Sequence, residues 1–153
     1  MSLYNKVFSK KDNYDHITLS KESSVSKNIK QVIVVRRDLN MRKGKIASQV
    51  AHASQAWLFA NNESNRVDEL KIKLTSSEAM WLTGSHAKVV TYVDSEDELR
   101  DLMFHAEIKG VQFHPIIDEG RTEFHGQSTL TCCAFGPDDE ESINEITGKL
   151  KLL

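Results

Sequence analysis

Apolar residues along the chain occur in short runs that alternate with stretches of helical periodicity. The first run is Val32 to Val35, four β-branched residues in sequence, which is typical of a strand buried on both faces. Pro115 lies within the third run and places it at an edge or an irregular position, and Gly136-Pro137 breaks the fourth. The predicted strands are Val32–Val35, Ala87–Val93, Val111–Ile117 and Thr129–Phe135.

Helical periodicity fills the intervals between these runs. Ser95 followed by Glu98 forms a capping-box pattern that starts a helix, and Gly110 ends it. The acidic run from Asp138 to Glu141 is typical of the first turn of another helix, because carboxylates favour the positive end of the helix dipole. Helices are predicted from about Lys43 to Asn61, Ser77 to Leu82, Ser95 to Gly110 and Asp139 to Ile146.

This alternation predicts one α/β domain with a mixed four-stranded sheet and helices on both faces. A chain of 153 residues is long enough for one such domain and short for two. Residues 1–28 are polar and lack sustained periodicity, so we expect a flexible N-terminal extension before a domain at 29–153. The tail, with Leu150, Leu152 and Leu153, is expected to pack back on that domain.

Composition narrows the possible functions. No segment approaches the roughly 20 apolar residues of a membrane span, and residues 1–28 lack the apolar core of a secretory signal. Cys132 and Cys133 are adjacent and cannot join distant segments, which indicates a cytoplasmic protein with reduced thiols. In a strand they point to opposite faces, so at most one faces a cleft. The histidines lack metal-ligand spacing, so neither a metal nor a cofactor is expected.

Positive charge is concentrated in one segment of the chain. The net charge of −2 is not that of a globally basic nucleic-acid binder. Between Arg36 and Lys45, however, five cations stand against the single acid Asp38. Charge alone leaves open whether this loop is merely solvated or contacts phosphates. Because ligands gather at the carboxyl ends of strands in open α/β sheets, this loop and residues Asp118 to Ser128 are the candidate site loops.

The helix predicted from about Lys43 carries two stripes, spaced at about 100° per residue. One is apolar and faces the core, whereas the other places a cation, an amide and an imidazole along the core margin. From spacing alone two interpretations are open: a chemical surface, or a Gln49 that satisfies backbone groups and a His52 hydrogen-bonded at the core edge. The apolar stripe is Ile46, Val50, Ala53 and Trp57, and the second is Lys45, Gln49, His52 and Ala56.

The segment from Val32 to Ala53 closely resembles the opening of the archaeal and eukaryotic type of peptidyl-tRNA hydrolase. In that family a buried strand runs into the pattern Lys-Gly-Lys-x-Ala-x-Gln-x-x-His-Ala, which this chain matches from Lys43 onward. Further blocks follow in the family's order, and the resemblance covers about residues 30–153. These blocks are Ile117 to Thr122, Thr131, Gly136-Pro137 and the ending Ile146 to Leu152.

The chain departs from the family pattern in the two candidate loops. Arg42 stands where a glycine is frequent, and Glu119 where an alanine is usual. The stretch Glu123–Leu130 replaces a segment that typically carries Pro-Gly, and it is one residue longer. Because the spacing changes there, Thr129 is an alternative to Thr131 as the family's second threonine.

The resemblance implies hydrolysis of the ester between a peptide and the 3′-terminal ribose of tRNA, by a homodimer. Lys45 would stabilise the oxyanion, while Asp118 would accept a proton from water or hold Lys45 in place. Water, the peptide and the terminal adenosine would be positioned by Thr122, Thr131, Gln49 and His52. The predicted phosphate contacts of the tRNA are Arg36, Arg37, Arg42 and Lys43.

An alternative keeps the fold without catalysis: a tRNA-binding or protein-interaction module derived from this hydrolase. The altered loop at 119–130 and residues 1–28 favour it, whereas the joint presence of Lys45, Asp118 and Thr122 favours the enzyme. An unrelated nucleotide-binding protein is disfavoured because Lys43-Gly44-Lys45 lacks the glycine spacing of a phosphate loop. No Gly-x-Ser-x-Gly elbow occurs either, so we expect activation of water rather than covalent catalysis.

Overall fold

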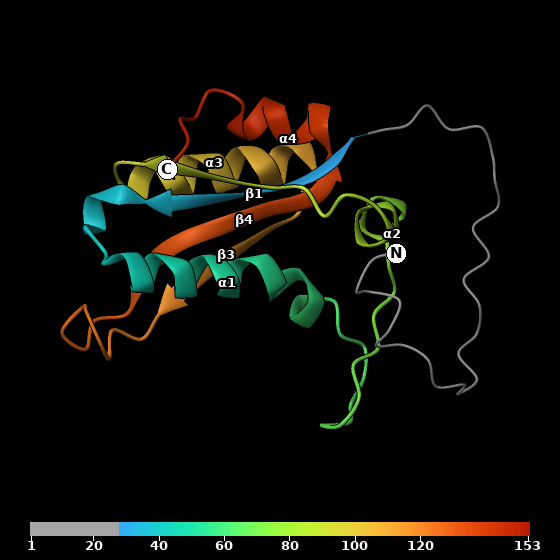
Figure 1. The fold of residues 1–153 in the computed structure, drawn as a ribbon, viewed down its shortest axis with the longest axis horizontal. Helices are drawn as coiled ribbons and strands as arrows, with labels where there is room; N and C mark the ends of the chain where they lie inside the picture. The colour runs from blue at the N-terminus through green and yellow to red at the C-terminus, as the bar shows by residue number, and fades with distance from the viewer. Residues whose placement is uncertain (1–27) are drawn as a thin grey trace, which may run out of the picture.

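Strand β1 (Ile29–Arg36) lies inside a four-stranded sheet of order β2-β1-β4-β3 in the computed structural model, which describes residues 28–153 (Figure 1). It is parallel to β2 (Lys88–Val93) and antiparallel to β4 (Thr129–Asp139), which is itself antiparallel to β3 (Phe113–Asp118). β1, β2 and β3 therefore run in one direction, and their carboxyl ends meet at one end of the sheet. The extension predicted for residues 1–28 falls outside the described residues except for Asn28.

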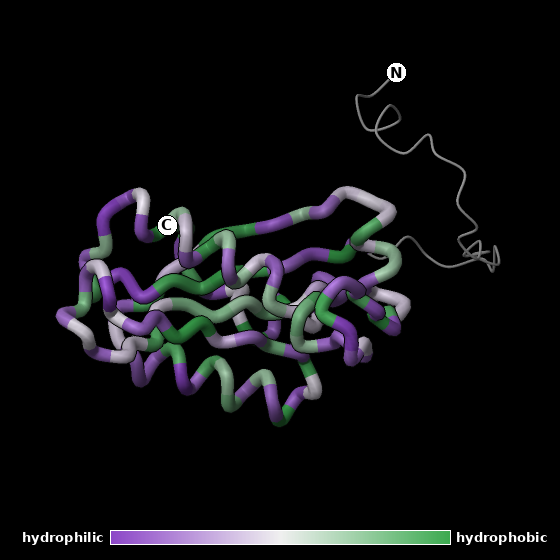
Figure 2. Tube along the Cα trace, turned by 90° about the horizontal axis from the view of Figure 1, so that it is seen from below, coloured by the Kyte–Doolittle hydropathy of each residue, from purple (hydrophilic) through white to green (hydrophobic). Residues whose placement is uncertain are grey.

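Helices cover both faces of the sheet, which confirms the predicted fold class. α1 (Lys43–Ala60) lies along one face, and α3 (Glu96–Lys109) and α4 (Glu140–Thr147) lie along the other (Figure 1). α2 (Ser76–Thr83) packs near the end of α1, where Trp57 and Trp81 form a small apolar cluster. Figure 2 shows hydrophobic residues concentrated along the strands at the centre of the molecule.

Successive residues of β1 enter opposite cores, because side chains alternate across a strand. Val32 and Val34 pack in the core below α3 and α4, whereas Ile33 and Val35 pack in the core below α1. All four are buried, so the prediction of a strand buried on both faces is confirmed. The three-residue turn η2 (Arg37–Leu39) then leads from β1 towards α1.

β4 continues through Gly136-Pro137, so the break predicted there is wrong. Gly136 has a φ of +81°, a backbone conformation that glycine adopts without strain. A Cβ at this position would lie 2.7 Å from the backbone nitrogen of Asp138. A register shift between Lys30 and Val32 lets β1 stay paired with β4 beyond the dipeptide. Gly136-Pro137 is thus an irregularity within the strand rather than its end.

The capping box predicted from the sequence at Ser95 and Glu98 is only partly formed, and a complete one occurs at another helix. Ser95 accepts a hydrogen bond from the backbone N–H of Glu98 at 3.1 Å, as predicted. The Glu98 carboxylate accepts from the backbone N–H of Asp94 at 2.7 Å instead of returning to Ser95, so this capping box is only half formed. A complete box joins Thr75 and Glu78 at the start of α2.

The two edges of the sheet differ. The C-terminal tail covers the β2 edge: Tyr92 N–H donates to the Lys151 carbonyl at 3.2 Å, and Leu153 N–H to the Val90 carbonyl at 3.1 Å. The prediction that the tail packs back is therefore confirmed. β3 forms the opposite edge, where no strand from the described part of the chain pairs with it. Pro115 is exposed on β3, which confirms the predicted edge position.

Candidate active site

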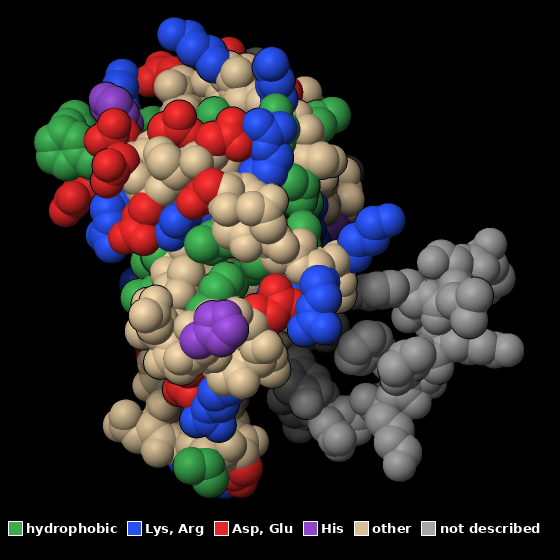
Figure 3. All heavy atoms as spheres, turned by 90° about the vertical axis from the view of Figure 1, so that its left-hand side faces the viewer, with side chains coloured by type: hydrophobic (Ala, Val, Ile, Leu, Met, Phe, Trp, Pro, Cys, Tyr) green, Lys and Arg blue, Asp and Glu red, His purple; other side chains and the backbone are tan. Residues whose placement is uncertain are grey.

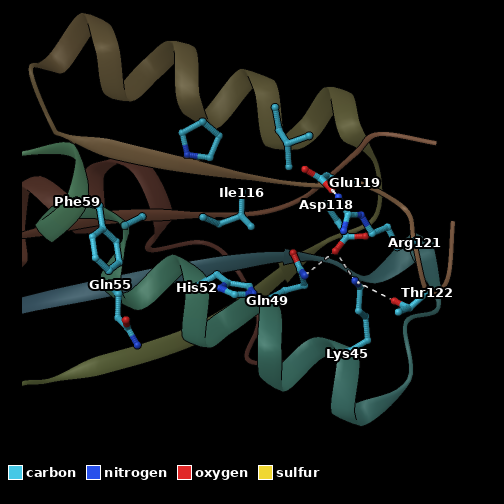
Figure 4. A pocket seen from close by; sticks show the side chains of 13 residues that line it. Lys45, Gln49, His52, Gln55, Phe59, Ile116, Asp118, Glu119, Arg121 and Thr122 are labelled. Carbon is cyan, nitrogen blue, oxygen red and sulfur yellow. Dashed lines mark hydrogen bonds and ion pairs between the residues drawn. The ribbon is translucent and has the colours of Figure 1, made fainter. Parts of the chain in front are cut away.

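A groove of about 620 Å³ runs between α1 and the edge strand β3 (Figure 4). The polar stripe of α1 lines one wall, so it faces a cleft. The next turn of the helix extends this wall, and residues 115–118 of β3 form the opposite wall. The lining of α1 is Lys45, Gln49, His52, Gln55, Ala56 and Phe59, and the loop after β3 adds Glu119, Arg121 and Thr122.

The direction of the strands brings Lys45 and Asp118 together. Lys45 lies in the first turn of α1, shortly after the carboxyl end of β1, and Asp118 is the last residue of β3. Because β1 and β3 point the same way, both residues lie at the same end of the sheet, with β4 between the two strands. Lys45 Nζ donates a hydrogen bond to Asp118 Oδ2, and the two side chains are only 11% and 15% exposed. The Thr122 hydroxyl lies 3.4 Å from the same Nζ (Figure 4).

Donors from three described residues converge on the Asp118 carboxylate. Besides Lys45, Gln49 Nε2 donates to Oδ2 at 3.0 Å, and the Gly120 N–H donates to Oδ1 at 2.9 Å. The hydrogen bond from Lys45, reinforced by those from Gly120 and Gln49, holds the pKa of Asp118 below its usual value although partial burial opposes this. Asp118 is therefore ionised at neutral pH.

Gln49 connects the groove to the interior. Its Oε1 accepts the hydroxyl of Thr131 at 2.6 Å, while its Nε2 donates to Asp118. Thr131 is 0% exposed, and its hydroxyl also lies 3.2 Å from the Ile116 carbonyl. The structure thus places Thr131 behind Gln49, where it orients the amide and does not reach water or substrate. Thr129 bonds to the Gln127 carbonyl within the loop and does not line the groove.

Comparison with known proteins identifies the family. The family model described as peptidyl-tRNA hydrolase PTH2 matches residues 29–153. Proteins named peptidyl-tRNA hydrolase from Haloquadratum walsbyi and Methanothermobacter thermautotrophicus are 41% and 40% identical to this chain, over 124 and 125 residues. These alignments cover 81% and 82% of this chain and 99% and 100% of theirs. A protein of the same name from Saccharolobus solfataricus is 41% identical over 125 residues. This chain belongs to the peptidyl-tRNA hydrolase PTH2 family.

The loop at 119–130, which departs from the family pattern, is tied to the start of α1. Glu123 Oε1 accepts from Arg42 Nε at 2.7 Å, and Glu123 Oε2 lies 3.4 Å from the Arg42 N–H. Phe124 packs against the core below α1, with its ring centroid 5.7 Å from Lys45 Nζ. Two departures from the family pattern, Arg42 and Glu123, therefore contact each other and hold the longer loop beside Lys45.

The four cations predicted to contact tRNA occupy different environments. Arg36 is buried, and its guanidinium donates to Asp38 and Glu96 at 2.7 Å each. A phosphate could reach it only by displacing these carboxylates. Arg37 is paired with Asp94 and lies outside the groove lining. Figure 3 shows cations and carboxylates interspersed over the end of the molecule where these loops lie.

Arg42, Lys43 and Arg121 remain as surface cations near the Lys45 end of the groove. Lys43 is exposed beside Lys45, and Arg42 is held by Glu123. Arg121 lines the groove and pairs with Glu119 at the surface, but the sequence interpretation did not name it as a tRNA contact. One indication of this role was present in the sequence, because Arg121 lies in the loop after β3, which is one of the two candidate site loops.

Gln55 and Phe59 were also missed as groove residues. Phe59 follows His52 by seven residues, so continuing the polar stripe of α1 by two turns would have found it. Gln55 follows His52 by three residues and belongs to the same wall.

The remaining chemical candidates do not join this site. Cys132 and Cys133 lie in the cores on opposite faces of the sheet, as predicted for adjacent strand residues. Burial raises the pKa of Cys132 to about 12, so its thiol is protonated at neutral pH. Within residues 28–153 no cluster of three or more histidine, cysteine or acidic side chains could hold a metal ion. No helix in this range is long and apolar enough to cross a membrane.

Thr131→Val is expected to lower the free energy of unfolding by about 1–3 kcal/mol, because Gln49 Oε1 would lose its buried donor. The value of kcat should also fall, with KM unchanged, because Thr131 touches Gln49 but not the groove. Urea unfolding and steady-state hydrolysis measure these effects. Thr131→Ser keeps the hydroxyl and should restore both quantities, and Thr129→Val should change neither. A raised KM at unchanged stability would contradict the buried position.

Proposed function

We propose that this protein hydrolyses the ester bond between the peptide and the 3′-terminal ribose of peptidyl-tRNA, which returns the tRNA to translation. The observation that carries the proposal is the Lys45–Asp118 pair at the end of a groove, with Gln49 and Thr122 beside it. Membership of the PTH2 family and relatives named peptidyl-tRNA hydrolase support the same reaction.

Lys45 is suited to stabilise the oxyanion. Attack of water on the ester carbonyl places a negative charge on its oxygen, which a fixed cation stabilises more in the transition state than in the ground state. Asp118 holds one Nζ proton of Lys45, and the ammonium has further protons for the substrate. Its low exposure strengthens the interaction with the developing charge.

Asp118 is better suited to hold Lys45 than to act as the general base. Its lowered pKa makes it a weak proton acceptor, because general bases work best with a pKa near the operating pH. The Thr122 hydroxyl lies near Lys45 Nζ and can orient the attacking water. His52 is seven residues from Lys45, about 10 Å along the helix, which favours substrate orientation over proton transfer at the same carbonyl.

The proposal is tested by the release of blocked amino acid from N-acetyl-aminoacyl-tRNA, with free aminoacyl-tRNA as the control substrate. We expect cleavage of the blocked substrate alone. A folded protein that binds tRNA but cleaves neither substrate would instead be a binding module, and the loop at 119–130 would then be the first candidate for the loss of activity.

A homodimer and a cytoplasmic location complete the proposal. The family resemblance supports the dimer, and sedimentation equilibrium of the full chain tests it by mass. The two free cysteines are buried in separate cores, which suits a compartment that keeps thiols reduced. Peptidyl-tRNA arises at ribosomes, so fractionation should recover the protein with the soluble translation machinery.

The double change Lys43→Ala with Arg121→Ala is expected to raise KM for tRNA substrates several-fold and leave kcat unchanged. Removing two phosphate contacts should also reduce the slope of log(kcat/KM) against log salt concentration by about two. Kinetics between low and moderate salt measure both effects. Arg66→Ala, an exposed arginine paired with Asp68 outside the groove, is the control and should leave the slope unchanged.

A further inference from the structure

We propose that the peptide half of the substrate lies along the free edge of β3, in the arm of the groove that leads from Lys45 to Phe59. The tRNA half then leaves the ester in the other direction, over Lys43 and Arg121. This assignment rests on the proposed hydrolysis of peptidyl-tRNA. It adds the direction in which the substrate lies along the groove and a site for the peptide.

The groove lies along the backbone of β3. Side chains of successive strand residues point to opposite faces, yet the consecutive residues 115–118 all line the groove. A cavity lined in this way follows the edge of the strand rather than one of its faces. β4 occupies the other side of β3, and no described strand occupies this one. An extended peptide can therefore add to this edge through main-chain hydrogen bonds.

Pro115 gives this edge a particular chemistry. It has no N–H, so the edge offers an acceptor there but not a donor. A full strand of another protein would lose a ladder bond at this position, which discourages permanent pairing. A short peptide can still donate its own N–H groups to the strand. The opposite edge of the sheet is closed by the C-terminal tail, so the edge beside the groove is the accessible one.

The charges of the lining residues indicate which end of the groove takes the tRNA and which takes the peptide. Arg121 lines one end, where it pairs with Glu119 at the surface, and Lys43 is exposed nearby. These two exposed cations suit the phosphates of tRNA, whereas Lys45 is held by Asp118 for the ester. At the far end, none of the described lining residues, Gln55, Ala56, Phe59 and Pro115, is charged. Phosphates placed there would lose water without gaining a cation, whereas a peptide carries no charge along its main chain.

The groove also exposes apolar surface along its length that suits peptide side chains. Phe59 is 65% exposed and Ile117 is 62% exposed, and both line the groove. Phe59 is 14 residues after Lys45, about 21 Å along α1, which corresponds to about six residues of extended peptide. His52 and Gln55 lie between them with polar groups for the peptide backbone (Figure 4).

The test compares two substrates that share the same tRNA: N-acetyl-glycyl-tRNA and a tRNA carrying an acetylated apolar hexapeptide that also ends in glycine. We expect a higher kcat/KM of the wild-type protein for the hexapeptide substrate. Phe59→Ala should lower kcat/KM for the hexapeptide about tenfold and leave N-acetyl-glycyl-tRNA unchanged. Phe104→Ala, at a similarly exposed phenylalanine on α3 outside the groove lining, should change neither value.

Two results would overturn the peptide site alone. An equal loss on both substrates would place Phe59 against the tRNA, and an undiminished rate on the hexapeptide substrate would remove it from the substrate altogether. A wild-type protein that cleaves neither substrate would overturn the hydrolase proposal and this one with it. Melting temperatures of both variants check folding, which the exposure of both phenylalanines should preserve.

Discussion

Lys45→Ala is expected to lower kcat for N-acetyl-aminoacyl-tRNA by about 10²–10³, the cost of removing one oxyanion donor, with little change in KM. The ammonium is nearly buried and fixed by Asp118, so solvent cannot replace it easily. Single-turnover hydrolysis separates this chemical step from product release.

Lys43→Ala is the matched control, because it removes a lysine two residues away that is exposed and does not line the groove. It should leave kcat nearly unchanged. Equal losses of kcat in the two variants would show that any positive charge at the start of α1 supports catalysis. Such a result would contradict a specific oxyanion role for Lys45.

Asp118→Asn is expected to lower kcat by at least about 10², within the range for a lost acid–base or positioning group. The amide keeps the shape of the carboxylate but loses the charge that holds Lys45. The double variant Lys45→Ala with Asp118→Asn distinguishes its roles. If Asp118 acts through Lys45, the double variant is no slower than the slower single one, whereas an independent base would give multiplied losses.

Glu119→Gln is the control for this variant, because it changes an exposed carboxylate next to Asp118 in the same groove. It should retain near wild-type kcat. A comparable loss in Glu119→Gln would indicate that the negative charge of the loop, rather than the contact between Asp118 and Lys45, supports hydrolysis.

The lowered pKa of Asp118 also predicts a dependence of stability on pH. Its carboxylate is ionised more readily when folded than when unfolded, so it stabilises the fold above the ordinary pKa and loses this effect as the pH falls through the folded value. The difference in unfolding free energy between the wild type and Asp118→Asn should therefore be constant near neutral pH and shrink below about pH 4. Urea unfolding at several pH values measures it.

Much of the fold and part of the site were predictable from local pattern. The β-branched run of β1 and the stripes of α1 depend on periodicities of two and 3.6 residues, which a sequence displays directly. The stripe containing Lys45, Gln49 and His52 does line one groove wall. The resemblance of the segment Val32 to Ala53 and of the block around Asp118 indicated the family, and the family model matches residues 29–153.

The hydrogen-bond partners and the exposure of several site residues were decided by the tertiary structure alone. The predicted phosphate contact Arg36 is buried between Asp38 and Glu96, and Thr131 lies behind Gln49, 82 residues away in sequence. A hydrogen-bond partner and the exposure of a side chain depend on which strands become neighbours, and that is set by packing of the whole chain. Pro115 predicted an edge or irregular position for β3, but only the assembled sheet places that open edge beside α1 and the groove.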